Sequence, residues 1–332
     1  NKNLKITTTN LETTMVSSID LEQETGSFVF VLPVFKTLEI ISAIDERLVE
    51  IKATETGKIK IKTKKGEYNI MGMEKEDFPV SHNDENKETI SLKTDDLKSI
   101  IKHTKHAIGK DDLKPALQGL FFKVETDKIV CVSTDGHRLV KTEIKNQTEK
   151  TQTEKIIPEK FLDILFNLLE TEEESHLEIS ENHIKIQIKN YTLNSRIIKE
   201  KYPDYNQVIP KENDKKLIIN KKTIIDSIRR ISILSNKISK QINLKIKQNE
   251  IEITTEDPEN ITSGQETIQC EYVGDSIEIG FNANYLKEAI SNTQGDQIEI
   301  LMKDNISAAI IKTAKETKID LKTLIMPLRT NS

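Results

Sequence analysis

The chain has 332 residues, which is more than one ordinary domain needs and favours two or three domains. Charged residues make up 31% of the chain and the hydrophobic set 36%; with no run of 18 apolar residues and no basic-then-apolar leader, the sequence predicts neither a membrane span nor a secretory signal. The net charge of −5 does not exclude binding to nucleic acid, because a DNA-binding face needs no more than a local basic stripe.

Strand and helix patterns alternate along the chain. Period-2 alternation indicates strands, as in residues 183–189, where every second residue is apolar. Spacing of i, i+3, i+4 indicates helices, as in residues 95–108, where Leu97, Ile101 and Ile108 share one face. In chain order we expect a helix after Phe30-Val31-Leu32-Pro33, strand 89–92, helix 95–108, strands 119–124 and 128–133, helix 158–169, strands 176–179, 183–189 and 193–199, strand 216–219, helix 220–234, strands 242–246 and 250–254, and helix 283–291.

Three markers recur at nearly one period, which indicates an internal repeat. One is a proline that closes a strand-rich stretch, with copies 124 residues apart, and another is a residue that opens a helix, with copies 125 residues apart. The third is a four-residue turn. In order, the copies are Pro79, Pro203 and Pro327; Pro33, Pro158 and Ala283; and the turns that begin at Thr9, Thr134 and Glu256.

The repeat predicts three related α+β domains with boundaries near Asn83 and Asn213, at residues 1–83, 84–212 and 213–332. The leading strand of the first copy would fall before residue 1. We therefore expect the first domain to be N-terminally truncated, with its front half and one helix missing. No linker is rich in Gly or Ser, so the domains are expected to pack rigidly.

Four motifs stand out: TDGHRL at 134–139, YPDYNQVIP at 202–210, GFNANYL at 280–286 and IMPLR at 325–329. Together they resemble motifs of the bacterial DNA sliding clamps, the beta subunit of the replicative polymerase. The resemblance spans the chain in register. It implies a head-to-tail homodimeric ring of repeated clamp domains around duplex DNA, with helices lining the ring and antiparallel sheets outside. It also implies a cytoplasmic processivity factor that catalyses no reaction and needs no cofactor.

A ring that slides must attract phosphates without gripping bases, so it needs lysines and arginines that face the hole. Two predicted helices are locally basic although acidic residues outnumber basic ones, 54 to 49. The alternative is a merely solvated polar face. The expected DNA-facing residues are Lys98, Lys102 and Lys105 on helix 95–108, Lys222, Arg229 and Arg230 on helix 220–234, and Lys114. Beside Lys114, Pro115-Ala116 depart from the family pattern, which often has aromatic or basic residues in this loop.

The resemblance further implies a groove between the second and third domains, where the polymerase, clamp-loader subunits and other partners dock short peptides. Its apolar wall would be Leu117, Leu139, Pro203, Val208, Ile306, Met326, Pro327 and Leu328, and its polar rim Thr134, Gly136, His137, Arg138, Asn282, Tyr285 and Arg329. Gln207, where relatives often have Arg, and the ending Thr330-Asn331-Ser332 depart from the family pattern and are expected to shift peptide preference. The alternative is that Met326-Pro327 only ends an edge strand.

The dimer contact implied by the family involves an apolar pair near the end of a helix in the third domain. Ile233 and Leu234 match this pair. Opposite them, Tyr68 and Ile70 in the closing strands of the first domain are the expected partners. The alternative is that both pairs belong to ordinary cores.

The sequence predicts no metal or nucleotide site. Cys131 and Cys270 have no CxxC partner, which also argues against a disulfide scaffold and is typical of a reducing compartment. His103 and His106 are three apart on a helix but lie among lysines. No phosphate-binding glycine motif occurs, so ring opening is expected to depend on an external loader ATPase.

Two other functions remain open at this point. A nuclease with Asp135, His137 and Glu256 as metal ligands is one, although Asp135-Gly136 is more typical of a tight turn. A repeat scaffold that binds proteins but no DNA is the other.

Overall fold

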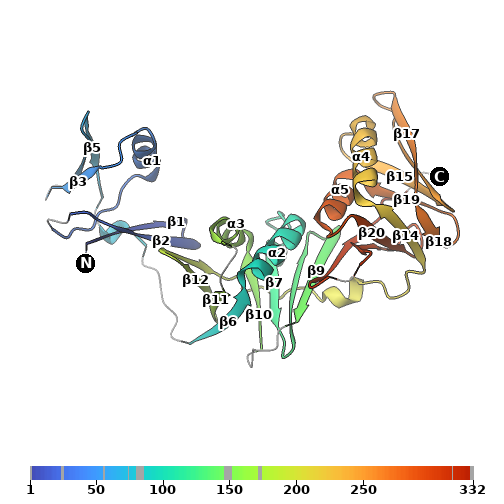
Figure 1. Ribbon diagram of the computed structural model, residues 1–332, viewed down its shortest axis with the longest axis horizontal. Helices are drawn as coiled ribbons and strands as arrows, with labels where there is room; N and C mark the ends of the chain where they lie inside the picture. Colours follow the sequence, from blue (N-terminus) through green and yellow to red (C-terminus); the bar gives the residue numbers. More distant parts are fainter. Residues whose placement is uncertain are drawn as a thin grey trace. The chain divides into compact units, whose positions relative to one another are not determined.

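A computed structural model of the chain describes residues 2–23, 26–54, 57–73, 75–79, 86–145, 152–170, 174–315 and 317–329. The backbone divides into two compact units, Asn1–Asn83 and Asp84–Ser332 (Figure 1). Antiparallel strands and a few helices build both units, which confirms the predicted α+β class.

The first unit is small, and few of its described side chains are buried. Strands β1 (Asn3–Thr9) and β2 (Thr13–Asp20) form a hairpin, and α1 (Val34–Ser42) follows it. Strands β3 (Glu50–Ala53), β4 (Lys58–Lys62) and β5 (Glu67–Met71) then form a three-stranded sheet, after which comes the 3-10 turn η1 (Lys75–Asp77). The alternation of β4 buries Ile59 and Ile61. Helix α1, in contrast, buries none of its residues, and Phe35 on it is 80% exposed.

The second unit contains two copies of one element order. The first copy has β6 (Lys87–Lys93), α2 (Thr94–Thr104), η2 (Lys105–Ala107), η3 (Pro115–Leu117), β7 (Gly119–Val124), β8 (Lys128–Thr134), β9 (Arg138–Lys145), β10 (Thr153–Pro158), α3 (Glu159–Leu168), β11 (Glu174–Ser180), β12 (His183–Ile188), β13 (Tyr191–Arg196) and η4 (Tyr205–Val208). The second has β14 (Lys215–Asn220), α4 (Lys221–Ile231), η5 (Ser232–Leu234), β15 (Gln241–Lys247), β16 (Glu250–Asp257), β17 (Thr262–Gln269), β18 (Glu271–Val273), β19 (Ile277–Asn282), α5 (Ala283–Asn292), β20 (Gln297–Met302), β21 (Ala309–Thr313) and β22 (Asp320–Ile325).

One continuous sheet joins the two copies. Its order is β10-β7-β8-β9-β22-β21-β20-β14-β18, and the copies meet where β9 pairs antiparallel with β22, with Leu139 opposite Leu324. Strands β17-β16-β15-β19 form a second sheet, and β6-β11-β12-β13 form a further antiparallel run. Within this unit α2, α3, α4 and α5 all lie on one side of the strands (Figure 1).

The turn marker found in the sequence has the same type of side-chain hydrogen bond in all three repeats. In each copy the side-chain oxygen of an Asn or Asp (Asn10, Asp135 or Asp257) accepts a hydrogen bond from the backbone amide two residues later, and in the first two copies also from the amide three residues later. In the first two copies the next residue lies in the left-handed region, with φ of 77° at Leu11 and 92° at Gly136, whereas in the third copy the left-handed residue is Ile261, four residues after Asp257, with φ of 52°. The repeat is therefore structural as well as sequential.

The predicted elements are present, and the differences lie at their ends. The helix predicted at 95–108 is α-helical only to Thr104 and ends in η2, and the helix predicted at 220–234 ends in η5 after Ile231. Tightening of the last turn into a 3-10 helix is common and invisible to periodicity. The strand predicted at 193–199 stops at Arg196, because Ile197 and Ile198 donate their amides to Asn182 and Ile156 instead.

Candidate peptide groove, basic helix face and association surfaces

Arg138 lies in a network that joins the two copies of the second unit. Its Nε donates to Asp135 Oδ2 at 3.1 Å, and its Nη1 donates to Glu288 on α5. The guanidinium carbon lies 4.4 Å from the centre of the Tyr285 ring, and only 10% of the side chain is exposed. Two carboxylates and one aromatic face fix Arg138, an arrangement suited to a planar guanidinium.

The turn before Arg138 is built by its own side chains. Asp135 Oδ1 accepts from the amides of His137 at 2.9 Å and Arg138 at 3.0 Å. Thr134 Oγ1 accepts from the Gly136 amide at 3.1 Å, and Gly136 adopts a positive φ that favours glycine. The tight turn predicted at Asp135-Gly136 is confirmed. It leaves His137 exposed, with its ring centre 6.2 Å from that of Tyr285.

The segment after β22 is held beside this turn by backbone bonds. The Met326 amide donates to His137 O at 2.9 Å, and the Leu328 amide donates to Gly280 O at 2.8 Å. Met326 is 46% exposed, Pro327 and Leu328 are half-buried, and Arg329 is exposed. A flexible thioether at the surface suits a site that accepts several partners.

One cluster of apolar side chains lies beneath these residues and spans the joint. It contains Leu139, Tyr202 and Leu324, and the partly buried Leu117 packs against it. The structure thus brings the predicted groove residues of the Thr134–Leu139 turn together with Leu117, Tyr285 and Met326. Three other predicted wall residues are exposed: Pro203 before η4, Val208 on η4 and Ile306 in the turn after β20.

Two polar residues of this region have intramolecular partners. Asn282 Oδ1 accepts from the amides of Asn284 at 3.0 Å and Tyr285 at 3.3 Å, so Asn282 is the N-cap of α5. Gln207 Nε2 donates to Asp204 Oδ2 at 3.0 Å. Asn282 therefore positions the helix that carries Tyr285. The predicted effect of residues 330–332 lies outside the described residues.

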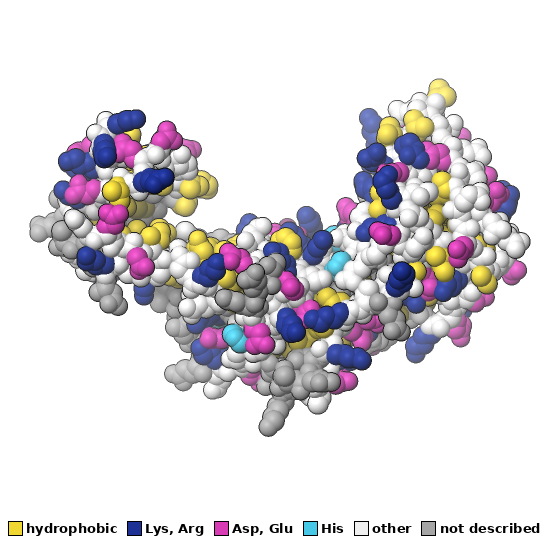
Figure 2. Space-filling view, in the orientation of Figure 1, with side chains coloured by type: hydrophobic (Ala, Val, Ile, Leu, Met, Phe, Trp, Pro, Cys, Tyr) yellow, Lys and Arg dark blue, Asp and Glu magenta, His cyan; other side chains and the backbone are white. Residues whose placement is uncertain are grey.

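Acidic neighbours neutralise much of the predicted basic face (Figure 2). The pairs are Lys105 with Asp163, Lys114 with Asp111 at 3.8 Å, Lys222 with Asp226 at 2.9 Å, and Arg230 with Glu266 through bonds of 2.6 and 2.7 Å. In the described part of the chain, Lys102 and Arg229 form no ion pair, and both are exposed. Among the predicted residues, these two are both exposed and without an acidic partner in the described part of the chain.

The position of Lys98 differs from the expectation of a free DNA-facing lysine. Its side chain is half-buried, its Nζ donates to Leu169 O at 2.9 Å, and it lies 5.6 Å from the centre of the Phe166 ring. It caps the C-terminal end of α3. Lys221 has the same role at α5, where its Nζ donates to Ser291 O and Thr293 O at 2.8 and 2.7 Å. Its partners lie about 70 residues away, so the sequence did not indicate it.

The predicted dimer residues differ in their exposure. Ile233 on η5 is 77% exposed, and Leu234 beside it is half-buried. In the first unit Tyr68 is 39% exposed, whereas Ile70 is 6% exposed and packs inside its own unit. Ile70 therefore offers little surface to a second chain. Strands β5 and β17 are each the last strand of a sheet, so their outer edges have no strand partner in the described residues.

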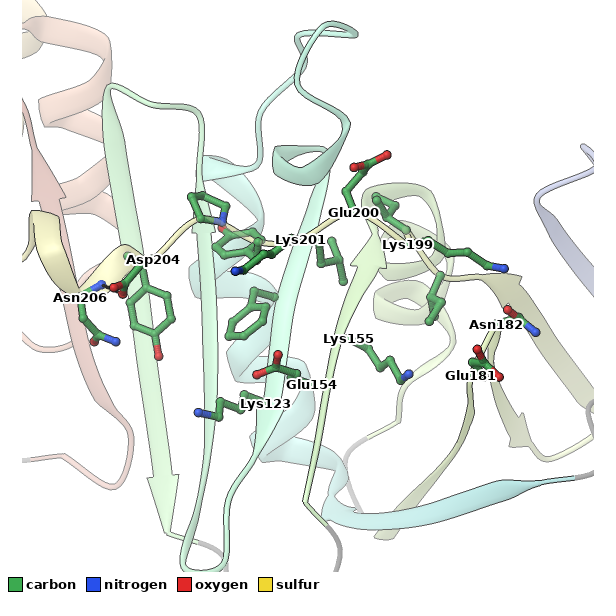
Figure 3. A pocket seen from close by; sticks show the side chains of 17 residues that line it. Lys123, Glu154, Lys155, Glu181, Asn182, Lys199, Glu200, Lys201, Asp204 and Asn206 are labelled. Carbon is green, nitrogen blue, oxygen red and sulfur yellow. Dashed lines mark hydrogen bonds between the residues drawn. The ribbon is translucent and has the colours of Figure 1, made fainter.

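A cavity of about 460 Å³ lies next to the groove residues (Figure 3). Strands β7 and β10 contribute Phe121, Lys123, Glu154 and Ile156, and the segment before η4 contributes residues 197–204, so that the cavity shares Pro203 with the predicted groove. No sequence signal indicated it, because its walls come from segments up to 85 residues apart.

Metal ligands do not gather in the described residues, where no three His, Cys, Asp or Glu side chains cluster. Both carboxylate oxygens of Asp135 accept hydrogen bonds, one from the His137 amide and one from Arg138. This argues against the hypothesis that Asp135 is a metal ligand of a nuclease. Burial lowers the pKa of His106 to about 4, so this ring is neutral at pH 7. None of the described helices has the length and apolarity needed to span a membrane.

Comparison with protein families places similarity along the whole chain. Residues 1–82, 91–204 and 206–329 match the models of the N-terminal, central and C-terminal domains of the DNA polymerase III beta subunit. The beta sliding clamp of Pseudomonas putida is 27% identical over 329 residues, which cover 98% of this chain and 89% of that protein. The beta sliding clamp of Haemophilus influenzae is 26% identical over 327 residues, 98% of this chain and 88% of that protein.

Solved structures agree with this similarity. A crystal structure of the DNA polymerase sliding clamp from Pseudomonas aeruginosa with a ligand superposes with a TM-score of 0.93 at 26% identity, over 99% of this chain and 90% of that chain. The sliding clamp from Bacillus subtilis gives a TM-score of 0.91 at 26% identity, over 99% and 89%. The predicted three-domain clamp fold is thereby confirmed.

Proposed function

Because the chain belongs to the DNA polymerase III beta-subunit family, a non-catalytic processivity subunit of the polymerase complex, we propose that it closes a homodimeric ring around duplex DNA and tethers the polymerase there. In this proposal residues 1–83, 84–212 and 213–332 are its three domains. The observation that carries it is the in-register match of all three domain models. The chain would act in the cytoplasm.

Contact with DNA would be weak and independent of base sequence. Lys102 on α2 and Arg229 on α4 are exposed, whereas Lys105, Lys222 and Arg230 are paired with acids. A few free charges suffice, because encirclement keeps the DNA close without strong contacts. Sliding favours such contacts to phosphates over hydrogen bonds to bases.

Partner peptides would dock beside the Arg138 turn. The exposed Met326, the stacked pair of His137 and Tyr285, and the apolar cluster below them offer an apolar surface with oriented polar groups. Such a combination suits extended peptides at a domain junction. The replicative polymerase, the clamp loader and other proteins with a clamp-binding motif would share it.

The ring would close between the first domain of one copy and the third domain of the other. Two features support this proposal: the exposed Ile233 on η5, and the outer edges of β5 and β17, which a second copy could pair. Tyr68 is the better candidate on the first domain, because Ile70 is buried.

The decisive test loads the protein onto nicked circular DNA with a clamp loader and ATP, and then cuts the circle. A topological tether stays on the closed circle in high salt and slides off once the DNA is linear. Loss of the protein in salt before cutting would mean that binding is only electrostatic, and would reopen the scaffold reading. DNA cleavage in the presence of divalent metal would support the nuclease reading instead.

A further inference from the structure

The cavity beside the groove lies at an open edge of the nine-stranded sheet. Strand β10 ends this sheet, and among the described strands its partner is β7. On its outer side one isolated antiparallel bridge forms, in which the Ile198 amide donates to Ile156 O at 3.0 Å. The residues after this bridge, 199–201, line the cavity together with residues 154–156 of β10 and with Phe121 and Lys123 of β7.

The backbone of Glu154 points toward the cavity. The Ile156 carbonyl faces away from β7, because it accepts from Ile198, while the Glu159 amide faces toward β7 and donates to Gln118 O. Backbone groups of alternate residues in a strand point to the same side. The N–H and C=O of Glu154 therefore face outward with those of Ile156, and no described strand pairs with them.

The opposite end of the sheet shows how an edge is normally protected. There β18 is only three residues long, a common way to prevent further pairing. Strand β10 is six residues long, and Glu154, Lys155 and Ile156 on it line the cavity. An accessible edge strand of this kind can accept an extended peptide as an additional strand.

The lining of the cavity suits a backbone ligand more than a charged one. Its side chains include four lysines and four carboxylates, so that neither sign of charge dominates (Figure 3). Phe121, Ile156 and Tyr205 supply apolar surface, and the Tyr205 ring lies 5.9 Å from that of Phe121. These features favour an uncharged, extended segment with an apolar or aromatic side chain.

Continuity with the proposed groove identifies the segment. Residues 202–208 form a shared wall, with Tyr202 and Tyr205 on the cavity and Pro203 and Val208 among the groove residues. We propose that the stretch of the polymerase flanking its groove-bound peptide lies in this cavity and pairs with the outer edge of β10 at Glu154. The inference rests on the proposed function and adds a second contact to it.

The test compares two substitutions at one position. Glu154→Pro removes the outward N–H and is compatible with an edge strand, whereas Glu154→Ala removes the side chain and keeps that donor. Binding of the purified replicative polymerase catalytic subunit from the same organism should weaken about three- to tenfold for Glu154→Pro and remain unchanged for Glu154→Ala. A fluorescein-labelled peptide of roughly ten residues that covers only the groove-binding segment should bind all forms equally, as a short groove ligand does not reach the cavity.

Hydrogen exchange on the unmodified chain gives an answer that does not depend on a variant's folding. The amides of residues 153–157 should exchange more slowly when the polymerase is bound, and not when the short peptide is bound. Polymerase binding unchanged by Glu154→Pro, together with no added protection, would overturn the proposal. If the unmodified chain binds neither polymerase nor peptide, the groove itself fails and the proposal fails with it.

Discussion

His106 is a half-buried residue at the joint between the two copies, and its two ring nitrogens are buried without a hydrogen-bond partner within the described residues. Burial, followed by the charge of Arg138, lowers its pKa from 6.5 to about 4, while Glu288 and Asp135 act in the opposite direction. Burial likewise lowers the pKa of His103, which bonds Asn292 O across the same joint. The folded chain thus holds these rings neutral.

This environment predicts a pH-dependent stability. The unfolded chain takes up a proton at His106 near pH 6.5, but the folded chain does so only near pH 4, so stability is fully present above pH 6.5 and declines as the pH falls toward 4. We expect the free energy of unfolding to fall by on the order of 2 kcal/mol across this window from this residue. Urea unfolding at pH 7 and pH 4.5 measures it.

Substitution separates His106 from the other titrating groups. His106→Leu should flatten the pH dependence, because it removes the group and leaves apolar packing. Gln187→Leu, at an exposed position on β12, introduces the same side chain without removing a titrating group and should leave the dependence as it is. An equal slope in the unmodified chain and in His106→Leu would contradict the assignment.

Helices α2 and α4 show how far periodicity predicts an element. The i, i+3, i+4 pattern identified the buried faces, and Leu97, Ile101 and Ile228 are indeed buried. The same pattern said nothing of what each outward cation would meet. Lys98 bonds a carbonyl 71 residues away, and Arg230 bonds Glu266, 36 residues away. Partners at such separations are set by the fold and cannot be read from one helix.

The groove motif has the same limit. The sequence predicted the turn at Asp135-Gly136 because its geometry is local. The partners of Arg138 could be predicted only in part: Tyr285 was expected near it from the family, whereas Glu288, 150 residues away, was not. The cavity at β10 was missed altogether, since an open sheet edge has no sequence signature of its own.

Lys102 on α2 and Arg229 on α4 have no acidic partner in the described residues, so we expect reversal of either charge to weaken DNA binding. Lys102→Glu and Arg229→Glu should each weaken binding to duplex DNA several-fold at low salt and reduce the slope of log affinity against log salt by about one per lost phosphate contact. The matched control is Lys245→Glu, at an exposed position on β15, which should have little effect. Salt titrations by fluorescence anisotropy measure both quantities, and equal losses for all three would point to a nonspecific charge effect.

At the scale of the whole molecule, the joint inside the second unit suggests what a second chain would add. Strand β9 follows the turn of one copy and pairs with β22 of the next copy. Strand β17 follows the equivalent turn of the last copy, yet its outer edge has no strand partner in the described residues. Burial of this edge and of the apolar side chains near it would stabilise a dimer.

Ile233 tests this association without disturbing the core, since its side chain is 77% exposed on η5. We expect Ile233→Asp to convert a dimer into a 37.9 kDa monomer in sedimentation velocity, because a buried unpaired carboxylate costs several kcal/mol at an interface, while the melting temperature of the fold changes little. Val273→Asp, at a position of similar exposure on β18, is the control and should remain dimeric. The monomer should also fail to stay on closed circular DNA in high salt, since an open chain cannot encircle it. An Ile233→Asp protein that still sediments as a dimer would place the contact elsewhere on the third domain.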